Sequence, residues 1–418
     1  MGVLSVRDLG NPLLARVPMY DFSEWSGALK RDPRDFWSKP YGRLPEDHIE
    51  ELDNLFVPTF QSSEVCANLH KHFISALRRR DPRIAQERQK IYELASEDPE
   101  KLGKELCRLK WFSDSASGAI IQGPTGCAKS HITTAYINLL SPLPYIDHGP
   151  MPECGWTFLR QIVYLKVYMP SDHSRASFLL AIMQEIERVL GPIANEHDYL
   201  KKFTREKNIE SKLLYVLKVL MIHRCGMLFV EESQEQNFAN AEWAGEFRTF
   251  FLRILNCGIP LVLIGNPLAF ENLVSSSQAR RRLAKGGMFN FVPAYDHTNA
   301  QWKKAARSIW AWTIFDQPDS YIPSDELLYE RSAGFYGYLA QYRKEVLTFA
   351  HRMGDTTVNQ MHFEAAWRSS VMTPFHDIIS AYVQKKSKLL VASDEPRNYM
   401  VAEWKKEAEL RGLAEPSH

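Results

Sequence analysis

Short hydrophobic runs alternate with helix-length segments through the middle of this chain. Three of the runs are almost wholly apolar, as buried strands are, and cover residues 118–122, 227–230 and 260–265. Two more, residues 161–167 and 288–292, complete five expected strands. Strands separated by helix-length segments form parallel sheets with right-handed crossovers. We therefore expect an α/β fold with a parallel five-stranded sheet as its core.

Helical periodicity fills the segments between these runs and, after Pro293, continues without further strands. We expect Ser174 to cap the helix that follows it. A small C-terminal helical lid behind an α/β base is the arrangement of AAA+ P-loop NTPases. The expected helices cover residues 62–110, 130–140, 174–190, 212–223, 242–256, 268–283, 300–315, 325–331, 336–351 and 359–370.

This pattern divides the chain into four parts. Residues 1–60 are rich in proline and aromatic residues and show little periodicity, so we expect an extended N-terminal docking arm. Residues 61–297 form the expected AAA+ α/β base domain with a helical lead-in. Residues 298–374 form the expected lid, and residues 375–418 a charged C-terminal tail.

Composition narrows the function classes. The 418 residues are 45% hydrophobic and 24% charged, which suits a globular protein with a sizeable core. The net charge of +1 indicates neither nucleic acid nor membrane, so any DNA binding must come from local patches. No apolar stretch is long enough for a bilayer, and Arg7 and Asp8 stand where a signal peptide needs apolar residues. With six scattered cysteines and no CxxC pair, we expect a cytoplasmic protein.

The strongest chemical signal is GPTGCAKS, which lies between an expected strand and an expected helix. Backbone N–H groups of such a P-loop converge on phosphates, and the helix N-terminus adds about half a positive charge. We expect ATP, with Lys129 at the β- and γ-phosphates and Ser130 on Mg²⁺. A glycine-rich turn with a chance lysine is the alternative. The expected nucleotide-binding residues are Gly123, Pro124, Thr125, Gly126, Cys127, Ala128, Lys129, Ser130 and His131.

One position departs from the P-loop pattern. Ala128 stands where the GxxxxGK motif has glycine. Its methyl group fits if the backbone is already helical there, so we expect the substitution to be tolerated.

The sequence MLFVEE reads as a buried strand that ends in two carboxylates, which is the Walker B arrangement. Glu231 would accept the Mg²⁺ water shell, and Glu232 would polarise the attacking water. Glutamate at the first place is one methylene longer than the usual aspartate, which would shift the metal and slow hydrolysis. A solvated pair of glutamates at a strand end is the alternative.

Two further sites complete the expected catalytic set. Asn266 follows the next apolar strand, where a sensor side chain would contact the γ-phosphate or the attacking water; an Asn-Pro turn is the alternative. Arg281 and Arg282 are candidates for an arginine finger that reaches a neighbour's γ-phosphate, an interaction worth roughly 10³–10⁵ in rate. An exposed basic helix end is the alternative reading of these arginines.

Five stretches, in order, resemble the TnsC/TniB family of AAA+ regulators of target-selecting DNA transposons. Two are the more specific: IVYLKVYMPSDHSRASF, and GIPLVLIGNPLAF, which is similar to the family's GVPVMLIGTPKA. The others are LPEDHIEELDNLFVP with FISALRRRDPR, MLFVEESQ and QARRRLAKGGMF. The resemblance covers roughly residues 45–350. Ala128, Glu231 and Asn266 depart from it, all at the nucleotide.

The resemblance implies a function. TnsC-like proteins bind ATP, assemble as rings or filaments around double-stranded DNA, and link a target selector to the transposase. Partners would thus be a TnsD/TniQ-like selector, a TnsA/TnsB- or TniA-like transposase and further copies of this chain. In that family the segment after the second strand faces DNA. Lys166, His173, Ser174 and Arg175 are the corresponding candidates, and they would contact phosphates rather than bases. The alternatives are a structural edge lysine at Lys166 and a solvated loop for the rest.

Two other functions stay open. The altered Walker residues allow a nucleotide-gated scaffold that hydrolyses little ATP. The second alternative is a replication initiator or helicase loader. An initiator usually carries an added DNA-reading domain, and no helix-turn-helix signal follows the lid. A lid arginine of the sensor type is not evident either, since residues 334–341 contain none and Arg343 only lies close by.

Overall fold

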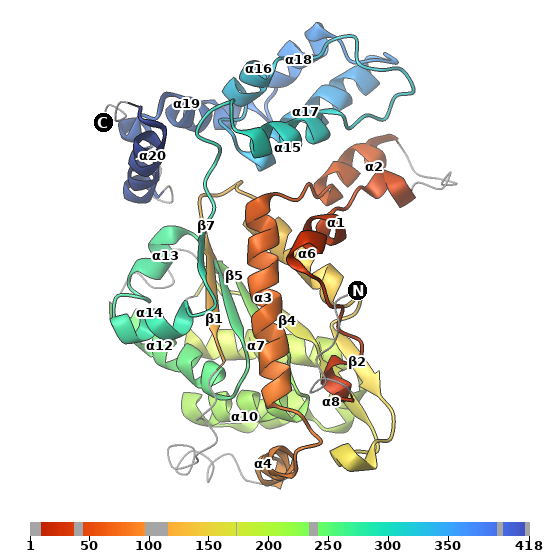
Figure 1. Ribbon diagram of the computed structural model, residues 1–418, viewed down its shortest axis with the longest axis vertical. Helices are drawn as coiled ribbons and strands as arrows, with labels where there is room; N and C mark the ends of the chain where they lie inside the picture. The colour runs from red at the N-terminus through yellow and green to blue at the C-terminus, as the bar shows by residue number, and fades with distance from the viewer. Residues whose placement is uncertain are drawn as a thin grey trace. The chain divides into compact units, whose positions relative to one another are not determined.

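The computed structural model describes residues 10–36, 45–96, 116–172, 174–233, 241–390 and 396–413 (Figure 1). The chain forms two compact units. The first contains Met1–Trp25, Glu64–Gln122 and Ile132–Asn290, and the second contains Ser26–Ser63, Gly123–His131 and Phe291–His418. The four-part division expected from the sequence stays a prediction.

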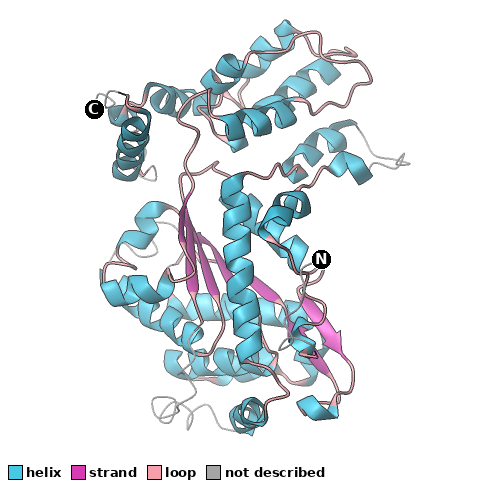
Figure 2. Ribbon diagram, in the orientation of Figure 1, coloured by secondary structure: helices cyan, strands magenta, loops and turns pink. Residues whose placement is uncertain are grey.

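The first unit is built on a parallel five-stranded sheet, drawn in magenta in Figure 2. Its order is β4-β5-β6-β1-β7, and every pair of neighbours is parallel. The expected core sheet is therefore confirmed. The strands are β1 (Gly118–Gln122), β4 (Tyr164–Tyr168), β5 (Met227–Ser233), β6 (Leu261–Gly265) and β7 (Met288–Asn290).

Helices bury both faces of this sheet. Successive residues of a strand point to opposite faces, so neighbours on one strand pack in different layers. On β5, Phe229 packs near the ring of Tyr136 at a centroid distance of 6.3 Å. Its neighbours Leu228 and Val230 belong to a core cluster with Phe178 and Phe251. In the described part of this unit the α-helices are α3 (Phe60–Arg79), α4 (Ala85–Ser96), α6 (Lys129–Leu140), α7 (Arg175–Leu190), α8 (Pro192–Glu196), α9 (Tyr199–Arg205), α10 (Ile209–Ile222), α12 (Ala241–Asn256), α13 (Pro267–Glu271) and α14 (Ser277–Leu283). The first residues of α3 and α6 belong to the second unit.

One expected strand is two strands in the structure. The apolar run 161–167 divides at Val163 into β3 (Leu159–Ile162) and β4. β3 pairs antiparallel with β2 (Tyr145–His148), which the sequence analysis missed. The N–H of Val163 donates to the Pro144 carbonyl, so the chain changes its hydrogen-bonding partner there and only β4 joins the core sheet.

One expected helix is two helices. The segment 268–283 divides into α13 and α14, and Ser276 caps α14 by accepting the N–H of Ala279 at 3.2 Å. A run of three serines, Ser275–Ser277, precedes α14, and serine hydroxyls compete with helical hydrogen bonds. The expected helix over 62–110 also breaks, at Asp81 and Pro82, and its residues beyond 96 lie outside the described part.

The second unit is helical. Its larger helices are α15 (Ala300–Trp310), α16 (Asp325–Glu330), α17 (Tyr336–Arg352), α18 (Gln360–Trp367), α19 (His376–Gln384) and α20 (Arg397–Arg411). The short helices α1 (Trp25–Leu29) and α2 (Pro45–Glu50) lie in the segment expected to be extended. Ile49 and Leu52 are buried among the lid helices, and Lys344 Nζ lies 2.8 Å from a Glu50 carboxylate oxygen and 2.9 Å from one of Asp53. These contacts anchor residues 45–54 on the lid.

Candidate functional site

The P-loop joins β1 to α6 and contains two left-handed backbone positions. Gly126 has a φ of +86° and Ala128 a φ of +62°. Glycine adopts these angles freely, whereas the Cβ of alanine costs about 1–2 kcal/mol there. The expectation of a helical backbone at Ala128 is therefore wrong, since α6 begins only at Lys129. The loop tolerates alanine with backbone strain.

The left-handed turns leave two amide groups of the loop open. Neither the N–H of Gly126 nor that of Ala128 donates a hydrogen bond to any residue that the structure describes. Backbone turns of this kind form concavities that bind anions. The loop therefore has the donors that a phosphate group requires.

The Lys129 ammonium is turned onto its own loop. Its Nζ donates to the carbonyl oxygens of Gly123 at 2.8 Å and Pro124 at 2.7 Å. Thr125 and Ser130 are exposed, whereas Cys127 is buried. The ring of His131 packs edge-on against Phe56 at 5.6 Å, and burial lowers the pKa of His131. Burial thus favours the neutral form of His131, and its ring makes an aromatic contact.

Close packing fixes the ends of the loop. A Cβ on Gly123 would lie 2.1 Å from the Phe291 carbonyl oxygen, so no other residue fits there. The N–H of Gly337, in the first turn of α17, donates to the Gly126 carbonyl at 3.2 Å. A Cβ on Gly337 would lie 3.2 Å from Gly126 Cα. The start of α17 therefore supports the middle of the loop.

Glu231, the first Walker B acid, is 1% exposed and has two partners. Its Oε1 accepts a hydrogen bond from Thr133 Oγ1 at 2.8 Å and lies 3.1 Å from Lys166 Nζ. Lys166 comes from β4, which pairs with β5. Thr133 lies one turn after Lys129 on α6, so this bond joins the P-loop helix to the acidic strand. The sequence analysis missed Thr133; its place one helical turn beyond the P-loop lysine was the available signal.

The strand is irregular at the two glutamates. The pairing of β5 with β6 is regular to Val230 and resumes at Ser233, opposite Gly265. A bulge of this kind re-aims side chains and is common beside active sites. The Glu232 side chain lies outside what the structure describes, so its role stays a prediction.

Asn266 stands at the end of β6 and caps a helix. Its Oδ1 accepts the N–H of Leu268 at 3.1 Å, in the first turn of α13. This is the turn-forming role that the sequence left open. The position at a strand end next to β5 is also the one expected for a sensor, which stays a prediction.

The candidate finger arginines lie in the last turn of α14. Arg281 is exposed. Arg282 is half-buried and donates to the Asn256 Oδ1, and burial lowers its pKa. Arg282 is therefore held within its own unit, and the role of the exposed Arg281 as a finger stays a prediction.

The candidate DNA contacts mostly have partners within the chain. Lys166 pairs with Glu231, as described above. Ser174 caps α7 by accepting the N–H of Ser177 at 3.2 Å, which confirms the expected cap. Arg175 lies 3.1 Å from a carboxylate oxygen of Glu246. His173 lies outside the described residues.

Arg343 is a structural residue of the lid. Its buried guanidinium lies 2.8 Å from an Asp319 carboxylate oxygen and donates from Nε to the Trp312 carbonyl at 2.8 Å. Both contacts are within the second unit. Arg343 is thus not available as a lid arginine that senses nucleotide.

The described residues lack two features. They contain no group of three or more His, Cys, Asp or Glu side chains placed to hold a metal ion. No helix among them has both the length and the apolar character needed to cross a bilayer.

Comparisons with known proteins address the fold. No protein-family model matches the chain, and no curated protein matches it. The solved structures that resemble it include the ORC1 protein of Aeropyrum pernix in complex with DNA, at 13% identity, with 75% of this chain and 82% of that chain covered and a TM-score of 0.40. The Aeropyrum pernix ORC2 protein with ADPNP and ADP gives 16% identity, 75% and 74% coverage and a TM-score of 0.41. Drosophila ORC bound to DNA gives 13% identity, 92% and 77% coverage and a TM-score of 0.38.

Likeness at this level carries no argument about function. The resemblance to TnsC/TniB likewise rests on the five sequence stretches alone. What identifies the fold is the molecule itself: a parallel sheet in the order β4-β5-β6-β1-β7, a P-loop directly after β1 and a helical second unit. The chain has an α/β P-loop NTPase fold of the AAA+ type.

Proposed function

We propose that this protein binds ATP through its P-loop, assembles on double-stranded DNA and couples the choice of a target site to recruitment of a transposase. The proposal of ATP binding rests on the hydrogen bonds that the P-loop makes and leaves unmade. The N–H groups of Gly126 and Ala128 are unbonded among described residues, and Lys129 donates to the carbonyls of Gly123 and Pro124. A triphosphate would satisfy those amides and draw Lys129 from the carbonyls to its oxygens.

The residues present suit magnesium as well as nucleotide. Mg²⁺ prefers oxygen ligands, and the Ser130 hydroxyl and the Glu231 carboxylate supply them. When bound, the ion would neutralise charge that develops on the phosphates. The Thr133 hydroxyl donates to Oε1 of Glu231 at 2.8 Å and so positions this carboxylate. In this proposal Glu232 orients the attacking water, Asn266 contacts the γ-phosphate, and Arg281 acts on the nucleotide of a neighbouring copy.

A second function is favoured by one specific contact. Lys166 Nζ lies 3.1 Å from the Oε1 of Glu231, so a metal must compete with an ammonium group for this carboxylate. That competition, with the longer glutamate and the strained Ala128, supports a nucleotide-gated scaffold that hydrolyses ATP slowly.

The DNA part rests on the sequence resemblance and on the segment after β4. The Arg175–Glu246 pair is partly exposed, with side chains 26% and 41% accessible, so DNA phosphates can replace Glu246. Each copy would contribute few cations. Binding would then depend on many copies that act together on one duplex.

Electron microscopy of the purified protein with duplex DNA tests this proposal. With a slowly hydrolysed ATP analogue we expect rings or filaments on DNA, and with ADP we expect few. Polymers should retain a TniA- or TnsB-like transposase in a pull-down. Particles that remain monomeric on DNA with the analogue would rule out the transposition regulator while leaving ATP binding intact.

A further inference from the structure

A cavity lies in the first unit, at the amino ends of the sheet strands. Arg224 precedes β5 by three residues, and Cys257 and Gly258 precede β6; all three line the cavity. Glu231 lies near the opposite, carboxyl end of β5. Since parallel strands share their amino ends at one edge of the sheet, this cavity is separate from the Walker B carboxylate.

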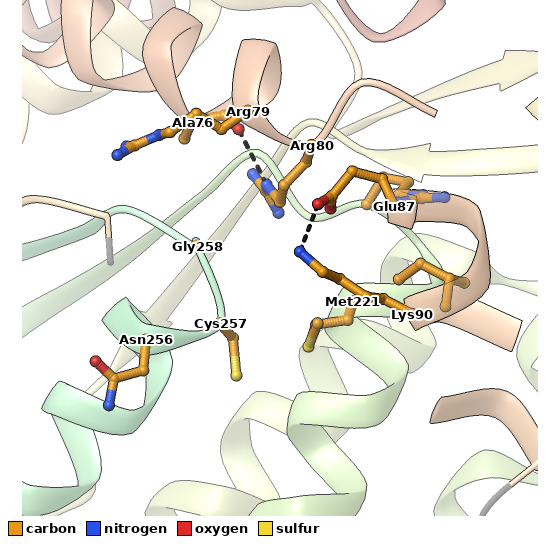
Figure 3. A pocket seen from close by; sticks show the side chains of 11 residues that line it. Ala76, Arg79, Arg80, Glu87, Lys90, Met221, Asn256, Cys257 and Gly258 are labelled. Atoms are coloured by element: carbon orange, nitrogen blue, oxygen red, sulfur yellow. Dashed lines mark hydrogen bonds and ion pairs between the residues drawn. The ribbon is translucent and has the colours of Figure 1, made fainter. Parts of the chain in front are cut away.

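Cations predominate around this cavity (Figure 3). Arg79 and Arg80 come from the end of α3, Lys90 from α4 and Arg224 from the turn after α10. Glu87 is the one carboxylate among the described lining residues, and its Oε1 lies 2.5 Å from Lys90 Nζ. The carboxylate is therefore already engaged by one of the four cations.

Arg80 has an unsatisfied end. It is 8% exposed, its Nε donates to the Ala76 carbonyl at 3.2 Å, and its Nη1 donates to the Cys225 carbonyl at 2.7 Å. Its Nη2 is buried and has no hydrogen-bond partner among the residues described. Burial lowers the pKa of Arg80 to about 10. In Figure 3 the guanidinium extends from α3 toward the cavity between Gly258 and Glu87.

Arg224 is buried, and the carboxylates of Glu87 and Asp81 attract it without forming an ion pair with it. It is 4% exposed, and its guanidinium forms no hydrogen bond or ion pair with any part of the chain that is described. Its φ of +50° places this arginine in the left-handed region, which costs about 1–2 kcal/mol. Burial lowers its pKa to about 10. Glu87 is already paired with Lys90 and Asp81 with Arg83, so neither carboxylate contacts Arg224 directly. A buried charge without a direct partner is costly, so two neighbouring buried guanidinium groups favour a counter-ion between them.

We propose that this cavity binds a compact phosphate-type oxyanion, held by Arg80 Nη2 and the Arg224 guanidinium. Guanidinium groups match phosphate oxygens with paired, charge-assisted hydrogen bonds. Duplex DNA does not fit, because its backbone contacts exposed cations and these two arginines are almost wholly covered. The source of the oxyanion is free phosphate or the terminal phosphate of a nucleotide.

Calorimetric titration with inorganic phosphate tests the site. The protein carries Lys129→Ala, so that the P-loop contributes little, and chloride at equal ionic strength is the reference. We expect one phosphate per chain, and at least tenfold weaker binding after Arg224→Asn, since asparagine accepts left-handed angles. Arg188→Gln, which removes an exposed cation of α7, should leave binding unchanged. ADP competes only if the site accepts a nucleotide's phosphate.

Two results would overturn the proposed site. One is the absence of phosphate binding at tens of millimolar. The other is equal phosphate binding by the Lys129→Ala protein with and without Arg224→Asn. If Arg224→Asn does not fold, Lys90→Gln replaces it, because that variant frees the Glu87 carboxylate beside the cavity and should weaken phosphate about tenfold. Undiminished binding by Lys90→Gln would then count against the proposal. Since Lys129 is already removed, neither outcome depends on the proposed ATP function.

Discussion

Lys166 and Glu231 form an ion pair across adjacent strands, with 3.1 Å between Nζ and Oε1. Glu231 is 1% exposed, so the ammonium supplies the charge compensation that a buried carboxylate requires. If Glu231 also holds Mg²⁺, as proposed, the ammonium and the metal compete for the same carboxylate.

Lys166→Met should therefore destabilise the protein without nucleotide by about 1–3 kcal/mol, because Glu231 keeps only the Thr133 hydroxyl. Added Mg²⁺-ATP should raise the unfolding temperature of the variant more than that of wild type. Thermal unfolding with and without Mg²⁺-ATP measures both effects. Lys212→Met is the control, since Lys212 lies over the Phe203 ring and forms no ion pair with a carboxylate of the described residues. Equal ligand-induced shifts in Lys166→Met and wild type would refute the competition.

Ala128→Gly should stabilise the fold by about 0.5–1 kcal/mol. Glycine removes the cost of a φ of +62°, and its greater freedom in the unfolded chain offsets part of that gain. Urea unfolding measures the change. Ala402→Gly, at an exposed position inside α20, should instead lose about 1 kcal/mol. A loss of stability in both variants would show that Ala128 is not strained.

Gly337→Ala should weaken ATP binding about tenfold while the fold is kept. The new Cβ would lie 3.2 Å from Gly126 Cα, and the P-loop must shift to relieve this contact. Binding of a fluorescent ATP analogue measures the effect. Gly27→Ala is the control, because its Cβ would meet nothing within 4 Å. Unchanged affinity in Gly337→Ala would mean that α17 does not support the loop.

Arg281→Ala should abolish most ATP turnover and retain ATP affinity, since the residue is exposed and would act on a neighbour's nucleotide. The loss expected for an arginine finger is roughly 10³-fold or more. Arg282→Ala should instead lower stability, because Arg282 donates to Asn256. Turnover assays on mixtures of Arg281→Ala and Lys129→Ala proteins give the critical readout. Activity that does not recover in the mixture would argue against action between copies.

Stability should fall as pH decreases from about 6.5 toward 4. Burial lowers the pKa of His70 and of His223 to about 4 from the ordinary value of 6.5. Between these values the unfolded chain binds protons that the folded chain does not, so each histidine removes up to about 1.4 kcal/mol per pH unit. Urea unfolding at pH 7, 6 and 5 measures the slope, and His223→Gln should reduce it. A slope unchanged by that variant would show that His223 is not neutral when folded.

Local sequence patterns predicted the parts that short-range chemistry determines. The strand 118–122 and the P-loop after it follow from an apolar run, a glycine-rich turn and a helix start. The break at Val163 was not predictable, because it depends on a hydrogen bond to Pro144, which lies 19 residues earlier in the chain. Ser276 is of a residue type that caps helices, but the helical periodicity continues across it, so one helix was expected over residues 268–283.

The site shows the same division. Residue type and spacing made Lys129, Ser130 and Glu231 candidates, and their roles stay predictions. The sequence pattern did not reveal that Ala128 takes a left-handed backbone or that Lys166 turns to Glu231, since both depend on how distant segments pack. The burial of Arg224 gave no sequence signal, because a lone arginine after a helix is ordinarily exposed.

The central claim is that the strand-to-helix loop at residues 123–130 holds a triphosphate. Calorimetric titration of the purified chain with ATP and Mg²⁺ tests it most directly, beside Lys129→Ala and the control Lys212→Ala. We predict saturable binding of one ATP per chain, lost in Lys129→Ala and kept in Lys212→Ala. Binding that is absent in wild type, or equally strong in Lys129→Ala, would contradict the claim.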